Sequence, residues 1–309
     1  MKLLRQLADF PAELRGGAVT IGNFDGVHLG HARIIERLLA AADRSGGPAI
    51  VFTFDPHPVR LLRPSSAPPP LTWTDRKAEL LALMQVDAMV AYPTDEALLN
   101  LSAPQFFDQI ICQQLAARAI VEGPNFRFGH ARKGTVDVLQ ELAGASQVAV
   151  EIVDPLIVDG EVVSSSRVRR LIADGRIDEA RQLLTQPYRI RGLIVHGAGR
   201  GNKIGFPTAN VDGIDTLLPS PGVYAGRVQL DGKSYATAVN IGPNPTFSEN
   251  AIKVEVHVIG WAGSLYGQVL EVDFLRRLRD IQRFDSVELL KQQLRQDVES
   301  ALQASTEIS

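Results

Sequence analysis

The first half of the chain alternates between short apolar runs and helical segments. Five runs rich in apolar and β-branched residues predict buried strands at Ala18–Gly22, Ala49–Phe54, Asp87–Tyr92, Arg118–Gly123 and Val148–Val153. Helical patterns lie between them at Ala32–Ala42, Asp75–Gln85, Ala103–Ala116 and Thr135–Leu142. Apolar strands without strict polar alternation, separated by helices, are typical of a parallel sheet covered on both faces. We therefore predict a doubly wound α/β fold, whose ligands bind beyond the carboxyl ends of the strands.

A different pattern begins near residue 187. Short strand-like runs are separated by glycine-containing turns, at Tyr188–Gly197, Gly222–Leu230, Ser234–Gly242, Ile252–Gly260 and Gln268–Leu275. This spacing predicts an antiparallel β-barrel. A terminal helix follows, with Val287, Leu290, Leu294, Val298 and Ala301 on one face. We predict two domains, 1–186 and 187–309, with the boundary after the helical stretch that ends near Leu184.

Composition excludes several classes of protein. Lys+Arg 32 against Asp+Glu 35 gives a net charge of 32 − 35 = −3, which disfavours general nucleic-acid binding. Cys112 is the single cysteine, so neither a disulfide framework nor a cysteine zinc site is expected. No apolar run approaches membrane-spanning length, and charged residues interrupt the first fourteen positions. We expect a cytoplasmic protein with no nucleic-acid and no membrane partner.

Two histidines follow the first predicted strand, in the stretch TIGNFDGVHLGHARIIERLL (Thr20–Leu39). Zinc sites of the H-E-x-x-H type need a third ligand, and nucleophilic catalysis needs a Ser or Cys beside its base. Neither set accompanies His28 and His31. A strand, a glycine-rich turn and a helix start favour phosphate binding instead. A simple helix-capping role for the histidines remains the alternative.

A second stretch, VVSSSRVRRLI (Val162–Ile172), places three serines before a helix that carries Arg167, Arg169 and Arg170. Serines at a helix start are usually caps, and arginines on an exposed helix are usually solvated. Combined with the histidine stretch, they predict a clamp that closes over a triphosphate.

The second half has a glycine-rich segment, GAGRGNKIGFPTANV (Gly197–Val211). Its glycines allow close approach of the backbone to phosphates, and Thr208 and Asn210 carry oxygen atoms suited to Mg²⁺. An ordinary glycine hairpin is the alternative. Further on, strand alternation places Lys253, Glu255 and His257 on one face, which by default faces solvent.

These motifs resemble a known family. GNFDGVHLGH, TFDPHP, NFRFG and SSSRVR occur in the order found in the adenylyltransferase half of prokaryotic bifunctional riboflavin kinase/FAD synthetases. GFPTAN, NIGPNPTF and a downstream LYG resemble the riboflavin kinase half. The resemblance covers residues 5–303. Three positions depart from the usual pattern: Ser166 stands for Thr, Asn125 for the Asp of many relatives, and Asn202 for a frequent Arg.

The resemblance implies a parallel sheet of the H-x-G-H nucleotidyltransferase type followed by a riboflavin kinase barrel. It also implies two reactions: phosphorylation of riboflavin by ATP to FMN, and adenylylation of FMN by ATP to FAD and pyrophosphate. ATP, riboflavin, FMN and FAD would be the partners and Mg²⁺ the cofactor, while self-association is left undecided.

The same resemblance assigns residues to roles. Catalytic roles fall on His28, His31, Arg169 and Glu255, the last as general base. Nucleotide binding falls on Gly22, Phe24, Asp25, Gly26, Gly30, Ser164, Ser165, Ser166, Gly199, Gly205, Pro207 and Thr208. Flavin binding falls on Pro56, His57, Pro58, Asn125, Phe126 and Phe128, and metal binding on Thr208 and Asn210.

Two other functions compete with this one. A nucleotidyltransferase acting on pantetheine phosphate, glycerol phosphate or a nicotinamide nucleotide would lack the kinase barrel. A non-catalytic flavin-binding or regulatory protein would be expected to have lost the histidines or Glu255, and both are present.

Overall fold

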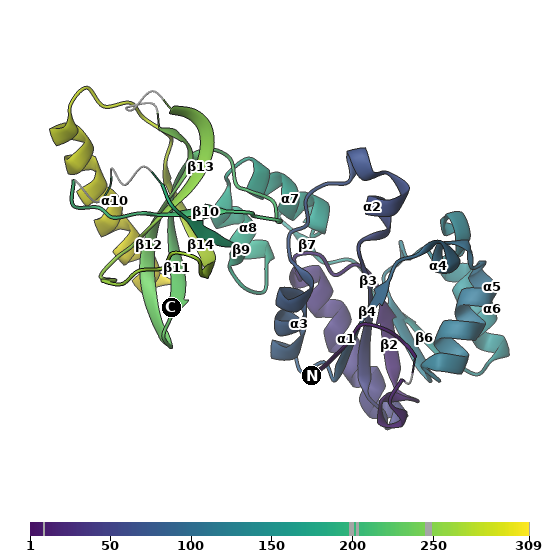
Figure 1. The fold of residues 1–309 in the computed structure, drawn as a ribbon. Helices are drawn as coiled ribbons and strands as arrows, with labels where there is room; N and C mark the ends of the chain where they lie inside the picture. Colours follow the sequence, from purple (N-terminus) through teal and green to yellow (C-terminus); the bar gives the residue numbers. More distant parts are fainter. Residues whose placement is uncertain (9, 198–200, 202–203, 245–248, 309) are drawn as a thin grey trace. The chain divides into compact units, whose positions relative to one another are not determined.

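The computed structural model describes residues 1–8, 10–197, 201, 204–244 and 249–308 (Figure 1). Contacts divide the chain into two compact units. The first contains Met1–Pro68 and Trp73–Ser165, and the second contains Pro69–Thr72 and Ser166–Ser309. This division falls at Ser165, whereas the sequence pattern predicts a boundary after residue 186, which stays a prediction.

The first unit is built on a six-stranded sheet in the order β1-β4-β3-β2-β5-β6, with every neighbouring pair parallel. The strands are β1 (Lys2–Leu4), β2 (Ala18–Ile21), β3 (Ala49–Asp55), β4 (Ala88–Pro93), β5 (Ala119–Glu122) and β6 (Ala149–Ile152). The predicted parallel sheet is confirmed. The pattern missed β1, because three residues are too few to show a periodicity.

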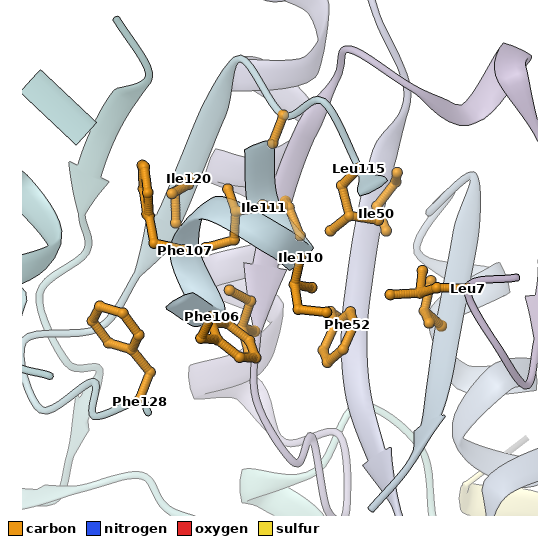
Figure 2. Packing of buried hydrophobic residues seen from close by; sticks show 14 of the residues in the cluster. Leu7, Ile50, Phe52, Phe106, Phe107, Ile110, Ile111, Leu115, Ile120 and Phe128 are labelled. Atoms are coloured by element: carbon orange, nitrogen blue, oxygen red, sulfur yellow. The ribbon is translucent and has the colours of Figure 1, made fainter. Parts of the chain in front are cut away.

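Helices cover both faces of this sheet because its four central strands bury consecutive side chains, which point to both sides. The helices are α1 (Leu29–Ser45), α2 (Pro58–Leu62), α3 (Thr74–Leu83), α4 (Glu96–Asn100), α5 (Ala103–Phe106), the π-helix η3 (Phe107–Gln114) and α6 (Val136–Ala145). Val51 of β3 packs in the cluster with α1 and α3, whereas Ile50 and Phe52 pack in the cluster with α5, η3 and α6. Figure 2 shows the second cluster, where Phe106 and Ile110 face Phe52.

Short elements complete the first unit. They are the 3-10 turns η1 (Ala12–Leu14), η2 (Pro64–Ser66) and η4 (His130–Arg132), and the hairpin of β7 (Ile157–Val158) with β8 (Glu161–Val162).

The second unit is a closed six-stranded barrel in the order β10-β13-β12-β11-β14-β9, with antiparallel neighbours throughout. Its strands are β9 (Tyr188–Val195), β10 (Ala209–Asp212), β11 (Gly222–Leu230), β12 (Lys233–Asn244), β13 (Glu249–Val258) and β14 (Val269–Arg279). The predicted barrel is confirmed. β10 was missed because its residues read as the end of the glycine-rich segment.

Among the elements that the structure describes, three helices belong mainly to the second unit: α7 (Ser165–Ala173), α8 (Ile177–Leu183) and α10 (Val287–Glu307). α8 packs against β9 and β14, and its Asp178 accepts a hydrogen bond from the Arg277 backbone N–H at 3.3 Å. α10 packs against β11, β12 and β14, where Arg279 forms an ion pair with the buried Asp297 at 2.7 Å. In the part of the chain that the structure describes, no helix has the length and apolar character needed to cross a membrane.

Candidate functional sites

The turn between β2 and α1 carries both histidines and is tightly constrained. Gly22 donates its backbone N–H to the Phe52 carbonyl at 3.0 Å, and the chain then passes through Phe24 and Val27 with φ of +46° and +39°. Such left-handed conformations are costly for residues with bulky side chains and persist only where the surroundings hold them. Both side chains are buried, which supplies that hold. We call residues 22–31 the histidine turn.

The two histidines cap helix α1 through one ring nitrogen each. His28 Nδ1 accepts a hydrogen bond from the His31 backbone N–H, and His31 Nδ1 accepts one from the His28 backbone N–H, both at 3.3 Å. The rings stack with centroids 3.6 Å apart. The histidines therefore do cap the helix, and a phosphate-binding role for them stays a prediction. Because each Nδ1 accepts, the neutral rings carry their protons on Nε2, which leaves two N–H donors for a ligand.

Burial keeps this pair uncharged. Desolvation lowers the pKa of His28 from 6.5 to about 4, although a backbone hydrogen bond partly opposes it. The pKa of His31 lies well below its ordinary value, mainly because of burial and also because a charge on His31 would be repelled by Lys77 and by a protonated His28. Near neutral pH, both imidazoles are thus hydrogen-bond donors without formal charge.

Val163 and Ser165, from the stretch that contains the three serines, contact the histidine turn. A Cβ atom added to Gly30 would lie 3.1 Å from both the His28 ring and the Val163 carbonyl oxygen, so a larger residue would force one of them to shift. Ser165 donates its hydroxyl to the Asp25 carbonyl at 2.8 Å. The structure thereby brings Ser165 to the histidine turn, as the clamp prediction requires.

Ser164 also belongs to the first unit, whereas Ser166 and the clamp arginines belong to the second. Ser166 is exposed, and Arg169 donates its Nε–H to the Pro69 carbonyl at 3.3 Å. Their place over a triphosphate stays a prediction.

Two buried ionisable groups beside the histidine turn escaped the sequence analysis. Glu122, at the end of β5, accepts a hydrogen bond from the Ile21 backbone N–H at 2.5 Å. Burial raises the pKa of Glu122 well above its ordinary value, although hydrogen bonds from Ile21 and Thr20 oppose this shift. Lys77 of α3 donates to Thr53 Oγ1 at 3.3 Å. Two features of the sequence could have indicated these groups. Glu122 is a carboxylate at the end of an apolar strand, and Lys77 lies on the apolar face of a helix.

The predicted flavin segments leave the sheet on either side of the histidine turn. One follows β3 and the other follows β5, the two strands that flank β2. His57 caps α2, with its Nδ1 accepting from the Val59 N–H at 3.0 Å, and Pro58 is the first residue of that helix. Pro56 accepts a hydrogen bond at its carbonyl from Thr94 at 2.6 Å.

In the segment after β5, Asn125 is exposed and the Phe126 ring stacks on Phe128 at 5.3 Å. Phe128 is buried against Phe106 in the hydrophobic cluster (Figure 2). Phe128 therefore anchors the segment in the core, and Phe126 presents more of its surface. A contact of either ring with a flavin stays a prediction.

In the barrel, strand register aligns three polar residues. Glu255 of β13 is the direct partner of Asn210 on β10 and of Asn240 on β12. Its neighbours Val254 and Val256 are buried, whereas Glu255 is half-buried, which confirms the predicted alternation. Asn240 was not singled out from sequence, because its alignment with Glu255 depends on strand pairing.

The glycine-rich segment lies against the same region of the barrel. A Cβ atom at Gly197 would collide with the Asn210 amide, and one at Gly201 would lie 3.3 Å from Thr208 Oγ1. The Pro207 carbonyl is hydrogen-bonded to His257 Nδ1 at 2.7 Å, which ties this segment to β13. Gly205 has a φ of +89°.

Some predicted residues fall outside the described part of the chain. They are Gly199 and its neighbours Arg200, Asn202 and Lys203, together with residues 245–247 of the NIGPNPTF motif.

Comparison with known proteins identifies both halves. The FAD synthetase family matches residues 10–167, and the riboflavin kinase family matches residues 184–305. The bifunctional riboflavin kinase/FMN adenylyltransferase of Pseudomonas fluorescens is 39% identical over 303 residues, which cover 97% of each chain. The chain belongs to the bifunctional riboflavin kinase/FMN adenylyltransferase family. It phosphorylates riboflavin to FMN and adenylylates FMN to FAD, with ATP as the co-substrate of both reactions.

Other relatives agree. The family members of Haemophilus influenzae and Escherichia coli K12 are 34% and 35% identical, covering 97% and 96% of this chain and 98% and 96% of their own. A crystal structure from Streptococcus pneumoniae, titled a macrolide-efflux protein, has the same two-part fold, with a TM-score of 0.85, 30% identity and 97% coverage of each chain. The match of residues 184–305 to riboflavin kinases disfavours the competing nucleotidyltransferases that lack a kinase barrel.

Proposed function

We propose that the two reactions use separate sets of residues, with FAD formation at the histidine turn and FMN formation beside Glu255. The observation that carries this proposal is the reciprocal capping of His28 and His31. It leaves two uncharged Nε2–H donors that have no partner among the described residues.

In FAD formation, an oxygen of the FMN phosphate attacks the α-phosphorus of ATP while the bond to pyrophosphate breaks. Catalysis of such transfers consists mainly of positioning and of stabilising charge on the phosphate oxygens. We assign that stabilisation to the histidine donors and to Arg169. The nucleotide binds along Gly22, the residues 24–26, Gly30 and the residues 164–166.

The flavin of FMN is placed between the two segments that flank the histidine turn. Residues 56–58 follow β3, and Asn125 and Phe126 follow β5. An exposed amide and a partly exposed aromatic ring suit the polar edge and the flat face of an isoalloxazine.

In FMN formation, Glu255 accepts the proton of the ribityl hydroxyl group as its oxygen attacks the γ-phosphorus of ATP. Gly199, Gly205 and Pro207 contact the nucleotide phosphates through the backbone. The side chains of Thr208 and Asn210 lie against Gly201 and Gly197, so two oxygen donors share the region that the glycines keep open. Such a pair suits Mg²⁺, which takes one or two protein ligands beside phosphate oxygens. Magnesium, when bound, neutralises charge on the ATP phosphates.

The domain boundaries 1–186 and 187–309 belong to this proposal. A chain of residues 187–309 should form FMN from riboflavin and ATP, because it contains every kinase residue named above. A matched chain of residues 166–309 retains α8, which packs on β9 and β14, and should be the more stable of the two. Separating FMN from FAD after incubation with riboflavin, ATP and Mg²⁺ measures both. Failure of both folded chains to form FMN would contradict the assignment.

A further inference from the structure

A buried lysine lies beside the histidine turn and has no part in the chemistry above. Lys77 is on α3, whose buried face also carries Leu80 and Leu81. Only 8% of the surface of Lys77 is exposed. Lysine is almost never this buried unless neighbouring groups compensate the charge.

The surroundings of Lys77 are the carboxyl ends of β2 and β3. Its Nζ donates to Thr53 Oγ1, and that hydroxyl donates in turn to the Asn23 carbonyl at 3.2 Å. Burial lowers the pKa of Lys77 below its ordinary value, and the carboxylates of Asp25 and Asp55 partly oppose this shift by favouring the ammonium form. That charge also acts on His31. The amino group therefore sits among residues of the histidine turn.

The hydrogen bonding of this ammonium group is incomplete. A lysine ammonium has three N–H donors, and Thr53 is its one hydrogen-bond acceptor within the described residues. Buried donors are normally satisfied, and leaving one without an acceptor is costly. Two N–H donors at this edge of the sheet are therefore available to the acceptor oxygens of a ligand.

The charge of Lys77 complements what the histidines provide. His28 and His31 donate hydrogen bonds but are uncharged, whereas a triphosphate carries several negative charges. We propose that Lys77 is a further substrate-binding residue, whose Nζ donates to a phosphate oxygen of ATP in FAD formation. This inference rests on the proposed location of FAD formation at the histidine turn.

The test compares Lys77→Met with Arg76→Met in the full-length chain. Methionine keeps the apolar stem of lysine and removes the charge and the donors. Arg76 is an equally buried cation on the same helix, but its guanidinium pairs with Glu79 at 3.1 Å. Hydrogen bonds to charged groups predict that Lys77→Met lowers kcat/KM for ATP in FAD formation about 10- to 100-fold. The KM for FMN and the formation of FMN from riboflavin should stay close to wild type, as should all values for Arg76→Met.

Inorganic triphosphate, used as a competitive inhibitor of FAD formation, probes the phosphate contact without adenosine. Its inhibition constant should rise in Lys77→Met by the same factor as the loss for ATP. An unchanged inhibition constant, or an equal loss in Arg76→Met, overturns the inference. If the methionine variant does not fold, the same two constants are measured for Lys77→Gln, which keeps a neutral donor and removes the charge. Full activity of His28→Ala would contradict the proposed function, whereas full activity of Lys77→Met would contradict the lysine contact alone.

Discussion

The histidine turn and the three aligned polar residues Asn210, Glu255 and Asn240, to which we assign the two phosphate transfers, offer contrasting environments. The histidine turn surrounds His28 and Lys77 with packed helices and strand ends, and burial shifts the pKa of each. Glu255 instead stands half-exposed on a barrel strand whose alternate residues, Val254 and Val256, fill the interior. The first environment selects the protonation state of its groups by excluding water. The second sets the position of a carboxylate by strand register.

This contrast predicts that the FMN-forming and FAD-forming activities can be lost separately. The largest loss of activity should follow Glu255→Gln. The substitution keeps size and polarity and removes the ability to accept a proton. General-base catalysis contributes about 10²–10⁴-fold, so FMN turnover should fall by that range. FAD formation from supplied FMN should continue, while FAD formation from riboflavin should fail. Near wild-type FMN formation would show that Glu255 only faces water.

His28→Ala and His31→Ala should each reduce FAD formation from FMN and spare riboflavin phosphorylation. Loss of one donor to a developing negative charge costs about 10²–10³-fold in turnover. His130→Ala is the matched control, because this exposed histidine lies outside the turn. Stoichiometric zinc in the purified protein, lost in the two variants, would contradict the phosphate assignment.

The buried histidine also predicts a pH dependence of stability. The pKa of His28 is about 4 in the folded chain and near 6.5 when unfolded, so the unfolded chain binds more protons between these values. The free energy of unfolding should therefore fall as the pH drops from 6.5 to 4, by roughly 3 kcal/mol from this residue.

Glu122 acts in the opposite direction above pH 4.5, because burial raises its pKa and stability decreases as the pH rises. The measurement must therefore compare the wild-type chain with His28→Asn, which retains a capping side chain. Identical pH slopes for the two chains would show that His28 is not buried in its neutral form.

Arg169→Ala should have the smallest effect of these. Loss of one charge-assisted hydrogen bond predicts a fall in FAD formation of about 10- to 100-fold, with FMN formation close to wild type. The control is Arg176→Ala, since Arg176 is exposed, pairs with Glu179 and lies outside the predicted clamp. Equal loss of both activities would assign Arg169 a structural role, consistent with the packing of α7 in the second unit.

The sequence was informative wherever a periodicity extended over enough residues. β2 to β6 and the long barrel strands were predicted, because runs of apolar residues report burial directly. β1 and β10 were missed, since they have only three and four residues and are held by pairing with strands distant in sequence. Lys77 and Glu122 were missed for a related reason: only the fold shows that their polar atoms end beside the histidine turn.

The strand that carries Asn210 also completes the ring of the barrel. β10 joins β9 on one side and β13 on the other through three paired residues each, so opening this strand opens the whole ring. A nucleotide that binds only the closed ring resists that opening, and at a hundred times its dissociation constant it adds about 2.7 kcal/mol. ATP would then be a structural support of the barrel as well as its reactant.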